Sequence, residues 1–298
     1  MTLAPRVVIV TRRSELDELM VRHGTRQAAG FFLAQRGRTL DEVQRRHELL
    51  DAAVTTVSAQ IPRDWRRGQV AREDLDRFAF APEDIVVAVG QDGLVANVAK
   101  YLDGQPVIGI DPEPDRNPGV LVRHPAANTA PLLDAAVSAA TEGASGRTMV
   151  QATADDGQQM RAINEIDVGP ASHQSARYRL GLPGDTAERQ SSSGIIAGTG
   201  TGATGWLLSV ARERRSPLQL PGPTDERVCW FVREAWPSPA TGIAHTQGTI
   251  GAGERLVVTA ESDQLVVFGD GMEHDAIRLA WGQRVEIGVA TQRLRLVD

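Results

Sequence analysis

The chain has 298 residues, enough for a large buried core that divides into two domains. Its net charge of −6 argues against a nucleic-acid-binding surface, which needs a stripe of basic side chains. No apolar run approaches membrane-spanning length and no signal-like segment opens the chain, so we expect no membrane partner. Cys229 is the only cysteine, so an intrachain disulfide is impossible; we expect a cytoplasmic protein with a buried thiol.

Arginine supplies almost all of the positive charge, because Lys100 is the only lysine. The lysine-containing P-loop motif is absent, and so is the lysine motif of protein kinases. Any phosphate-binding site must therefore use backbone amides, arginine or a metal ion.

The first half of the chain alternates between apolar strand patterns and helical patterns. Strands are predicted at Arg6–Thr11, Asp84–Val89 and 106–110, and helices at 15–35, Leu40–Gln60, 94–102 and 128–140. The run Asp84–Val89 has no polar alternation, as expected for a parallel strand covered on both faces. The charged segment 63–76 predicts surface, and residues 111–119 hold three prolines and predict a loop.

The second half consists of short alternating runs separated by turn residues. Strands are predicted at 147–153, 176–180, 228–232, 255–259, 264–268, 284–289 and 293–297, and one helix at 204–215. We therefore expect an α/β domain over residues 1–145 and a β-rich domain over residues 146–298.

The segment Gly90-Gln91-Asp92-Gly93 follows the buried run Asp84–Val89 directly. A strand that ends at glycine and continues as a helix leaves backbone amides that suit phosphate oxygens. Asp92 would sit at the carboxyl end of a parallel strand, where α/β sheets place ligands, and its carboxylate could accept a proton from a hydroxyl nucleophile. An ordinary surface turn is the structural alternative.

A strand-like run at residues 195–198 opens into a second loop rich in glycine and threonine. The hydroxyls of Thr199, Thr201 and Thr204 are placed to bond the sugar or phosphate of a nucleotide. Gly200, Gly202 and Gly205 also fit the dinucleotide-binding fingerprint, with Asp225 about twenty residues further on. Three prolines in 216–223 weigh against that Rossmann interpretation, because Asp225 then ends no obvious parallel strand.

Asn164 and Glu165 form a third candidate pair, between apolar neighbours. An adjacent amide and carboxylate can bind a ribose diol or an adenine amine, although the exposed face of a strand would show the same pattern. The six histidines have no metal-ligand spacing, so we expect no protein-held metal site.

Together these three segments resemble the motifs of the NAD kinase superfamily, in order and spacing. Gly90-Gln91-Asp92-Gly93 is similar to its Gly-Gly-Asp-Gly motif, and Asn164-Glu165 to its Asn-Glu motif. Residues 199–206, which end in Trp206, are similar to its Thr-Pro-Thr-Gly-Ser-Thr-Ala-Tyr loop. The likeness is greatest to the mitochondrial-type NAD kinases, which share the Thr-Gly-Thr-Gly core and the closing tryptophan, and it covers nearly the whole chain.

The resemblance implies an N-terminal α/β nucleotide-binding domain followed by a β-sandwich-like domain. It implies transfer of the γ-phosphoryl group of ATP, with Mg²⁺, to the 2′-hydroxyl of the adenosine ribose of NAD. Asp92 would be the general base, whereas the nucleotide-binding residues would be Gly90, Gln91, Gly93, Asn164, Glu165, Thr199, Thr201, Gly202, Thr204 and Trp206. We also expect a homo-oligomer, with a dimer favoured, although the sequence does not set the number of subunits.

Three residues of the first domain depart from the family pattern. Gln91 replaces a glycine, which would cost about 1–2 kcal/mol if the position needs a positive φ. Leu94 stands where the family has threonine, so a hydroxyl is lost near the helix start, where it would serve phosphate. Asp111 replaces an asparagine. These changes keep open a kinase for another nucleoside or sugar hydroxyl, a non-catalytic dinucleotide-binding protein, and an NAD-linked oxidoreductase.

Overall fold

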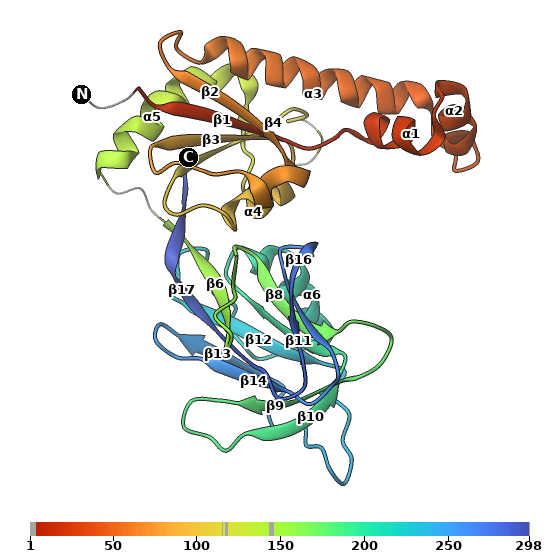
Figure 1. The fold of residues 1–298 in the computed structure, drawn as a ribbon, viewed down its shortest axis with the longest axis vertical. Helices are drawn as coiled ribbons and strands as arrows, with labels where there is room; N and C mark the ends of the chain where they lie inside the picture. Colours follow the sequence, from red (N-terminus) through yellow and green to blue (C-terminus); the bar gives the residue numbers. More distant parts are fainter. Residues whose placement is uncertain (1–3, 115, 117–118, 143–145, 298) are drawn as a thin grey trace. The chain divides into compact units, whose positions relative to one another are not determined.

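The chain folds into two compact units, each built of strands and helices (Figure 1). The structure is a computed structural model that describes residues 4–114, 116, 119–142 and 146–297. Unit 1 comprises Met1–Ala144 together with Arg295–Asp298, and unit 2 comprises Ser145–Leu294. In the described part of the chain no helix has the length and apolar character that a membrane crossing requires.

Unit 1 contains a parallel sheet in the order β2-β1-β3-β4, with the last residues of β17 beside β4. Its strands are β1 (Arg6–Thr11), β2 (Arg66–Ala71), β3 (Asp84–Val89), β4 (Pro106–Asp111), the short β5 (His124–Pro125) beside β4, and the end of β17 (Arg284–Leu296). Every residue of β3 is buried, which confirms the prediction of a parallel strand covered on both faces.

Helices cover both faces of this sheet (Figure 1). The helices of unit 1 are α1 (Glu15–His23), α2 (Arg26–Ala34), α3 (Leu40–Gln60), α4 (Asp92–Ala99) and α5 (Thr129–Glu142), with short 3₁₀ turns at Arg72–Arg77 and Ala126–Asn128. On one face, α3 and α5 share a core with alternate side chains of β1, β3 and β4, including Ile9, Val87 and Ile108. The short α4 packs on the same strands, and its residues 94–99 are all buried.

The helical stretch predicted at 15–35 is two helices rather than one. Gly24 has a φ of 73°, a left-handed conformation that ends α1 and that glycine adopts without strain. Thr25 then accepts a hydrogen bond from the amide of Ala28 and starts α2. These helices and the start of α3 enclose a small core of their own, which includes Leu19, Leu33 and Val43.

The charged segment 63–76, predicted only as surface, contains the edge strand β2. Its residues pair in parallel with β1, from Arg6 beside Arg66 to Thr11 beside Ala71. Only Val70 of this strand is buried. The polar composition hid the strand because an edge strand needs little apolar surface.

Unit 2 contains two sheets that share one core, as in a β-sandwich. One sheet has the order β10-β9-β14-β17, with β6 beside β17 and β7, and the other is an antiparallel sheet in the order β13-β12-β11-β8-β15-β16. The strands are β6 (Gly146–Ala154), β7 (Gln159–Ala162), β8 (Glu165–Pro170), β9 (Ala176–Gly181), β10 (Glu188–Ser192), β11 (Gly194–Gly198), β12 (Arg227–Arg233), β13 (Gln247–Gly251), β14 (Leu256–Ala260), β15 (Leu265–Gly269), β16 (Met272–Leu279) and β17.

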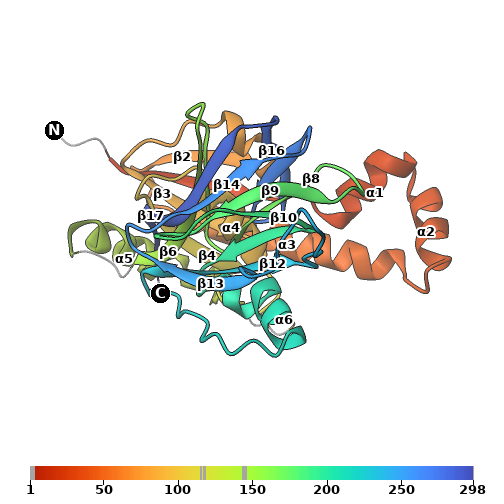
Figure 2. The same cartoon turned by 90° about the horizontal axis from the view of Figure 1, so that it is seen from below.

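The face of the second sheet that points away from this core carries α6 (Trp206–Glu213), which follows the 3₁₀ turn Gly202–Thr204 (Figure 2). Leu207 and Val210 of the helix pack on Ile196 of β11 and Phe231 of β12. Cys229 is buried in the same cluster, which confirms the prediction of a core thiol.

The sequence patterns are least informative for the strands of unit 2. Strands β7, β8, β10, β13 and β16 are not predicted, because their side chains alternate only weakly. The strands predicted at 284–289 and 293–297 are one strand, β17. The residues between them, 290–292, include neither glycine nor proline, and nothing there ends the strand.

Candidate functional site

The Gly90-Gln91-Asp92-Gly93 motif connects β3 to the first turn of α4. The amide of Gly90 donates to the carbonyl of Ile110 over 2.9 Å, which holds the turn against β4. Gln91 has a φ of −104° and a ψ of 167°, an extended conformation. The strain expected if Gln91 replaced a left-handed glycine is therefore absent. α4 begins at Asp92, two residues before its predicted start, so Asp92 lies in its first turn.

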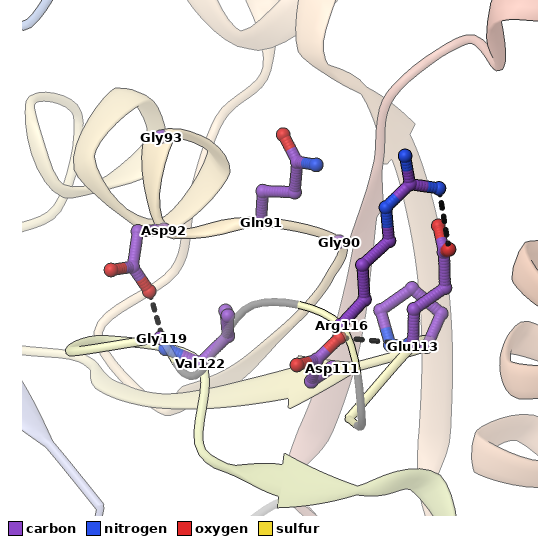
Figure 3. Close-up of a pocket in the computed structure, with 10 residues that line it drawn as sticks. Gly90, Gln91, Asp92, Gly93, Asp111, Glu113, Arg116, Gly119 and Val122 are labelled. Atoms are coloured by element: carbon purple, nitrogen blue, oxygen red, sulfur yellow. Dashed lines mark hydrogen bonds and ion pairs between the residues drawn. The ribbon is translucent and has the colours of Figure 1, made fainter.

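A hollow of about 300 Å³ opens beside this motif within unit 1 (Figure 3). Its lining consists of Gly90, Gln91, Asp92, Gly93, Asp111, Pro112, Glu113, Arg116, Gly119 and Val122. The first amides of α4 have no partner within the helix and lie at the positive end of its dipole, which favours phosphate oxygens. A Cβ atom added to Gly93 would meet nothing within 4 Å, so there is free space at the helix start.

Gln91 and Leu94, which both depart from the family pattern, have opposite exposures. Gln91 is exposed, makes no side-chain capping bond to α4, and points away from the Asp92 carboxylate (Figure 3). Leu94 is only 4% exposed, and its Cδ2 atom lies 3.1 Å from where a Cβ of Gly90 would stand. Leu94 is not among the residues that line the hollow, and the expectation that a threonine hydroxyl at this position would serve phosphate stays a prediction.

The carboxylate of Asp92 accepts hydrogen bonds from three consecutive backbone amides. Oδ2 accepts from Val120 over 2.7 Å, and Oδ1 accepts from Leu121 and Val122, each over 2.9 Å. Figure 3 shows the bond from Val122. A carboxylate oxygen can accept two hydrogen bonds, and only one described residue donates to Oδ2, so Oδ2 keeps one acceptor position toward the part of the chain that the structure describes. Asp92 therefore fixes the 120–122 segment and still has an acceptor for a ligand hydroxyl.

Two glycines permit this contact. A Cβ on Gly119 would lie 2.4 Å from the carbonyl oxygen of Val122 and 2.6 Å from Oδ1 of Asp92. A Cβ on Gly109, in β4, would lie 2.0 Å from the carbonyl oxygen of Leu121. Either side chain would force the 119–122 segment away from Asp92. The glycines are visible in the sequence, but their contact partners are not.

Three further charged residues line the hollow and are not among the predicted site residues. Burial raises the pKa of Asp111, and the charges of Glu113 and Asp92 raise it too, whereas the hydrogen bond from the Glu113 amide opposes them. The Glu113 carboxylate pairs with Arg46 at 3.0 Å and with Arg116 at 3.4 Å. The hollow thus holds three carboxylates and the guanidinium of Arg116.

In unit 2, the Asn164-Glu165 pair and the glycine-threonine loop lie against each other. Asn164 and Glu165 stand at the start of β8, and the amide of Thr199 donates to the carbonyl of Asn164 over 2.9 Å. A Cβ on Gly202 would lie 2.3 Å from that same carbonyl oxygen. A Cβ on Gly200 would lie 2.0 Å from the carbonyl oxygen of Gly222. The glycines of this loop therefore allow close backbone packing.

The three threonine hydroxyls of this loop differ in what they bond. Thr199 Oγ1 donates to the carbonyl of Ile163 and accepts from the amides of Thr201 and Gly202, so it has no position left for a nucleotide, contrary to our expectation. Thr204 Oγ1 donates to the carbonyl of Thr201 over 2.9 Å and can still accept. Thr201 Oγ1 is buried and has no hydrogen-bond partner within the described residues.

The Rossmann interpretation of this loop is wrong. β11 is antiparallel to both of its neighbours, β8 and β12, whereas a dinucleotide fingerprint follows a strand of a parallel sheet. Asp225 accepts a hydrogen bond from the amide of Gly222 over 2.9 Å and closes a local turn.

A second hollow, of about 240 Å³, lies within unit 2 beside Glu165. Its lining consists of Glu165, Asp167, Trp206, Phe268, Asp270, Gly271 and Glu273. Glu165 and Trp206 are predicted site residues, but the other five are not. Of these five, Asp167 could have been predicted from its spacing to Glu165, because residues two apart point to the same face of a strand.

Asp270 holds the Asn-Glu segment in place. Its Oδ2 accepts from the amide of Ile163 over 2.8 Å, and its Oδ1 accepts from Asn164 and Glu165 over 2.8 and 3.3 Å. Asp270 and Gly271 form the two-residue turn between β15 and β16, with φ values of 51° and 67°. Aspartate and glycine are the residues that tolerate such a turn.

Burial changes the protonation of two carboxyl groups in this hollow. Burial, then the charges of Asp270 and Asp167, raise the pKa of Glu165 to about 8. Burial also raises the pKa of Asp167 to about 6, opposed by the charge of Arg233. At pH 7 Glu165 is therefore mainly protonated, and Asp167 is mainly ionised.

Comparisons with known proteins identify the fold. No protein-family model matches the chain, and no curated protein matches it. Among solved structures, an NAD kinase from Archaeoglobus fulgidus in complex with ATP is similar over 97% of this chain and 92% of its own, with a TM-score of 0.56 and 16% sequence identity. The chain therefore has a fold similar to that of an NAD kinase, whereas the narrower likeness to mitochondrial-type enzymes has no support in these comparisons.

Proposed function

We propose that the chain is an ATP-dependent phosphotransferase of the NAD kinase type, which phosphorylates the 2′-hydroxyl of the adenosine ribose of NAD to give NADP. The observation that carries the proposal is the Asp92 carboxylate, with one acceptor position unused, beside an open helix N-terminus. The NAD kinase-like fold of the chain supports the same assignment.

In the proposed reaction, unit 1 holds the phosphates. Gly90, Gln91 and Gly93 line the hollow in which the triphosphate would bind, and the amides of Gln91 and Gly93 would donate to its oxygens, whereas the amide of Gly90 donates to Ile110. Oδ2 of Asp92 accepts the proton of the acceptor hydroxyl. The hydroxyl oxygen forms a bond to the γ-phosphorus as the bond from that phosphorus to the bridging oxygen breaks, and ADP leaves.

Unit 2 would bind the acceptor. Asn164 and Glu165 present an amide and a mainly protonated carboxyl group, which together can donate to and accept from a nucleoside. The unbonded hydroxyl of Thr201, the acceptor position of Thr204, and Trp206 complete this proposed binding set.

Mg²⁺ would enter with ATP. Among the described residues, no group of three or more His, Cys, Asp or Glu side chains is arranged to hold a metal ion. The ion would be bound mainly by phosphate oxygens and water, together with a carboxylate, for which Asp111 in the hollow is suited. The ion would neutralise the charge that develops on the transferred phosphoryl group.

The test is to incubate the purified chain with ATP, Mg²⁺ and NAD and to measure NADP enzymatically. Formation of NADP that disappears in the Asp92→Asn variant supports the proposal. Consumption of ATP only when a different nucleoside or sugar is supplied would assign another acceptor.

A second candidate is a dinucleotide-binding protein without catalysis. It is favoured by the three amide hydrogen bonds of Asp92, which give the carboxylate a structural role independent of chemistry. NAD-dependent thermal stabilisation without NADP formation would support this candidate.

A further inference from the structure

The hollow in unit 2 combines negative charge with aromatic surface. Asp167 of β8 stands directly across from Phe268 of β15, so both side chains lie on the same face of the sheet. Glu165, two residues from Asp167, shares that face. Trp206 begins α6 on this face, at the edge of the hollow, and is 41% exposed.

Carboxyl groups make up much of the lining of the hollow. Four carboxyl groups line it, those of Glu165, Asp167, Asp270 and Glu273. Arg233 lies beside two of the lining residues: its guanidinium is 5.0 Å from the centre of the Trp206 ring, and its Nε is 3.8 Å from Asp167 Oδ1.

Asp167 is an incompletely bonded charge in this hollow. The residue is 9% exposed, and its Oδ1 atom has no hydrogen-bond partner in the part of the chain that is described. Arg233, at 3.8 Å, is an ion-pair partner beyond hydrogen-bond distance, and the Nε atom of Arg233 lacks a hydrogen bond as well. A buried carboxylate oxygen without a hydrogen bond is costly, so a donor or a positive charge near Asp167 would stabilise it.

We propose that this hollow binds a flat, singly charged organic cation, which lies against Trp206 and Phe268 and is neutralised by Asp167 and Glu273. An aromatic face beside carboxylates is the arrangement that recognises organic cations. A metal ion does not fit, because no metal-binding group of side chains is found among the described residues. One source of such a cation, which rests on the proposed function, is the charged ring of oxidised NAD; the other is a free small-molecule cation.

The protonation of the carboxyl groups that line the hollow supports this assignment. Glu165 faces Asp270 and Asp167, Asp167 faces Arg233, and Glu273 lines the same space. A bound cation favours the ionised carboxylates and lowers the pKa values of Glu165 and Asp167. Cation binding should therefore release protons and strengthen as the pH rises through the range from about 6 to about 8 that these two pKa values define.

The test is calorimetric titration of the full chain with 1-methylnicotinamide, a cation, and with nicotinamide, its neutral analogue. NAD and NADH, whose rings differ in charge, are titrated in the same way without ATP. We expect the cation of each pair to bind at least about fivefold more tightly, and more tightly at pH 8 than at pH 6. Selectivity in the dinucleotide pair assigns the acceptor ring as the occupant, and selectivity confined to the small molecules assigns a free cation.

The matched variants are Glu273→Gln in the hollow and Asp263→Asn, an exposed acid of the same unit outside it. Glu273→Gln should weaken the cation about twofold to fivefold and leave the neutral analogue unchanged, as expected for one exposed charge. Trp206→Leu should weaken the cation as well, whereas Asp263→Asn should change neither ligand.

Equal binding of the charged and neutral ligands, or the same loss in Glu273→Gln and Asp263→Asn, would overturn the cation site. The outcome is independent of the kinase assignment. NADP formation without charge selectivity keeps the kinase and removes the cation site. Charge selectivity without NADP formation keeps the cation site and removes NAD as the acceptor.

Discussion

Asp92 in unit 1 and Asp270 in unit 2 make the same type of contact, but the consequences for the two sites differ. Each follows a buried strand and precedes a glycine, and each accepts hydrogen bonds from three consecutive backbone amides. In both, Oδ1 accepts two bonds and Oδ2 accepts one of those three. An aspartate can thus fasten a loop and line a hollow at the same time.

The surroundings separate the two. Asp92 begins a helix, whose positive end favours its charge, and it holds a segment that carries no predicted binding residue. Asp270 lies in a hairpin turn and holds the predicted Asn164-Glu165 pair, and its charge raises the pKa of Glu165. The first arrangement keeps a carboxylate available beside the hollow of unit 1, whereas the second adds to the effect of burial in raising the pKa of Glu165.

The largest expected effect separates the two aspartates. Asp92→Asn should lower turnover by about 10²–10⁴-fold, because it removes the proton acceptor. It should also destabilise unit 1 by about 1–3 kcal/mol, because an amide nitrogen cannot accept one of the three hydrogen bonds. Steady-state kinetics and thermal unfolding measure the two effects.

Asp270→Asn is the matched comparison, since it should cost similar stability but should weaken NAD rather than lower turnover at saturating substrate. If both variants lose turnover in proportion to their stability, Asp92 is only structural. If Asp92→Asn turns over at a near-native rate, Asp92 is not the base.

The pH dependence of stability tests the raised pKa of Glu165, which burial causes first and the charges of Asp270 and Asp167 increase further. The pKa of Glu165 rises from 4.5 to about 8 on folding, so between these values the folded state holds a proton that the unfolded state has lost. This contribution is complete below pH 4.5 and is lost as the pH rises through about 8. Glu165→Gln should therefore be more stable than the native chain at pH 9 by a few kcal/mol at most, with a smaller difference at pH 5.

Thermal unfolding of both chains across this range gives the difference directly. Parallel pH profiles for the native chain and Glu165→Gln would mean that Glu165 keeps an ordinary pKa. Asp92→Asn should leave this profile unchanged in shape, because its partners lie in unit 1.

Truncation of Glu165 tests the division of labour between the units. Glu165→Ala should weaken NAD by about 1–3 kcal/mol, because polar groups of the ligand lose their partner, and should leave ATP nearly unchanged. Separate titrations with NAD and with ATP measure this. Equal losses for the two nucleotides, or a loss of thermal stability alone, would assign Glu165 to the sheet surface.

The elements that build unit 1 could be predicted more fully than the contacts that complete either site. Continuous apolar runs and turn residues indicate β1, β3, β4 and α4, and thereby the position of Asp92 at a strand end. The amides that donate hydrogen bonds to Asp92 lie 28 to 30 residues away and follow a proline-rich loop, so no local sequence pattern predicts these bonds. The same holds for Asp270 and Asn164, which are 106 residues apart.

The glycines of the 199–205 loop show most clearly why a sequence motif alone does not define a binding site. In the 199–205 loop, Gly200 and Gly202 permit close packing on Gly222 and Asn164, whereas a fingerprint interpretation assigns them to phosphate. The direction in which β11 pairs with its neighbouring strands decides between these two interpretations, and a single sequence does not specify that direction. At position 91, likewise, the family's glycine suggested a left-handed turn that the backbone does not adopt.

The smallest expected effect concerns Gln91, which has no counterpart in unit 2. Its side chain is exposed, lines the hollow and bonds nothing in α4, so it occupies room near the amides that would bind phosphate. Gln91→Gly should strengthen ATP use by about 1 kcal/mol, or about fivefold in KM, without relief of backbone strain. Gln91→Ala should give a similar gain, because a methyl group also clears the hollow.

Gln91→Ser is the informative control for that gain. A serine at the N-cap should stabilise α4 by about 1 kcal/mol through a bond to one of the first amides, and so should compete with phosphate for the same donor. We therefore expect Gln91→Ser to raise the melting temperature while it gains less ATP affinity than Gln91→Ala. If instead both Gln91→Gly and Gln91→Ala abolish activity, the amide of Gln91 binds substrate directly, and the chain is a kinase adapted to a donor or acceptor other than the one proposed.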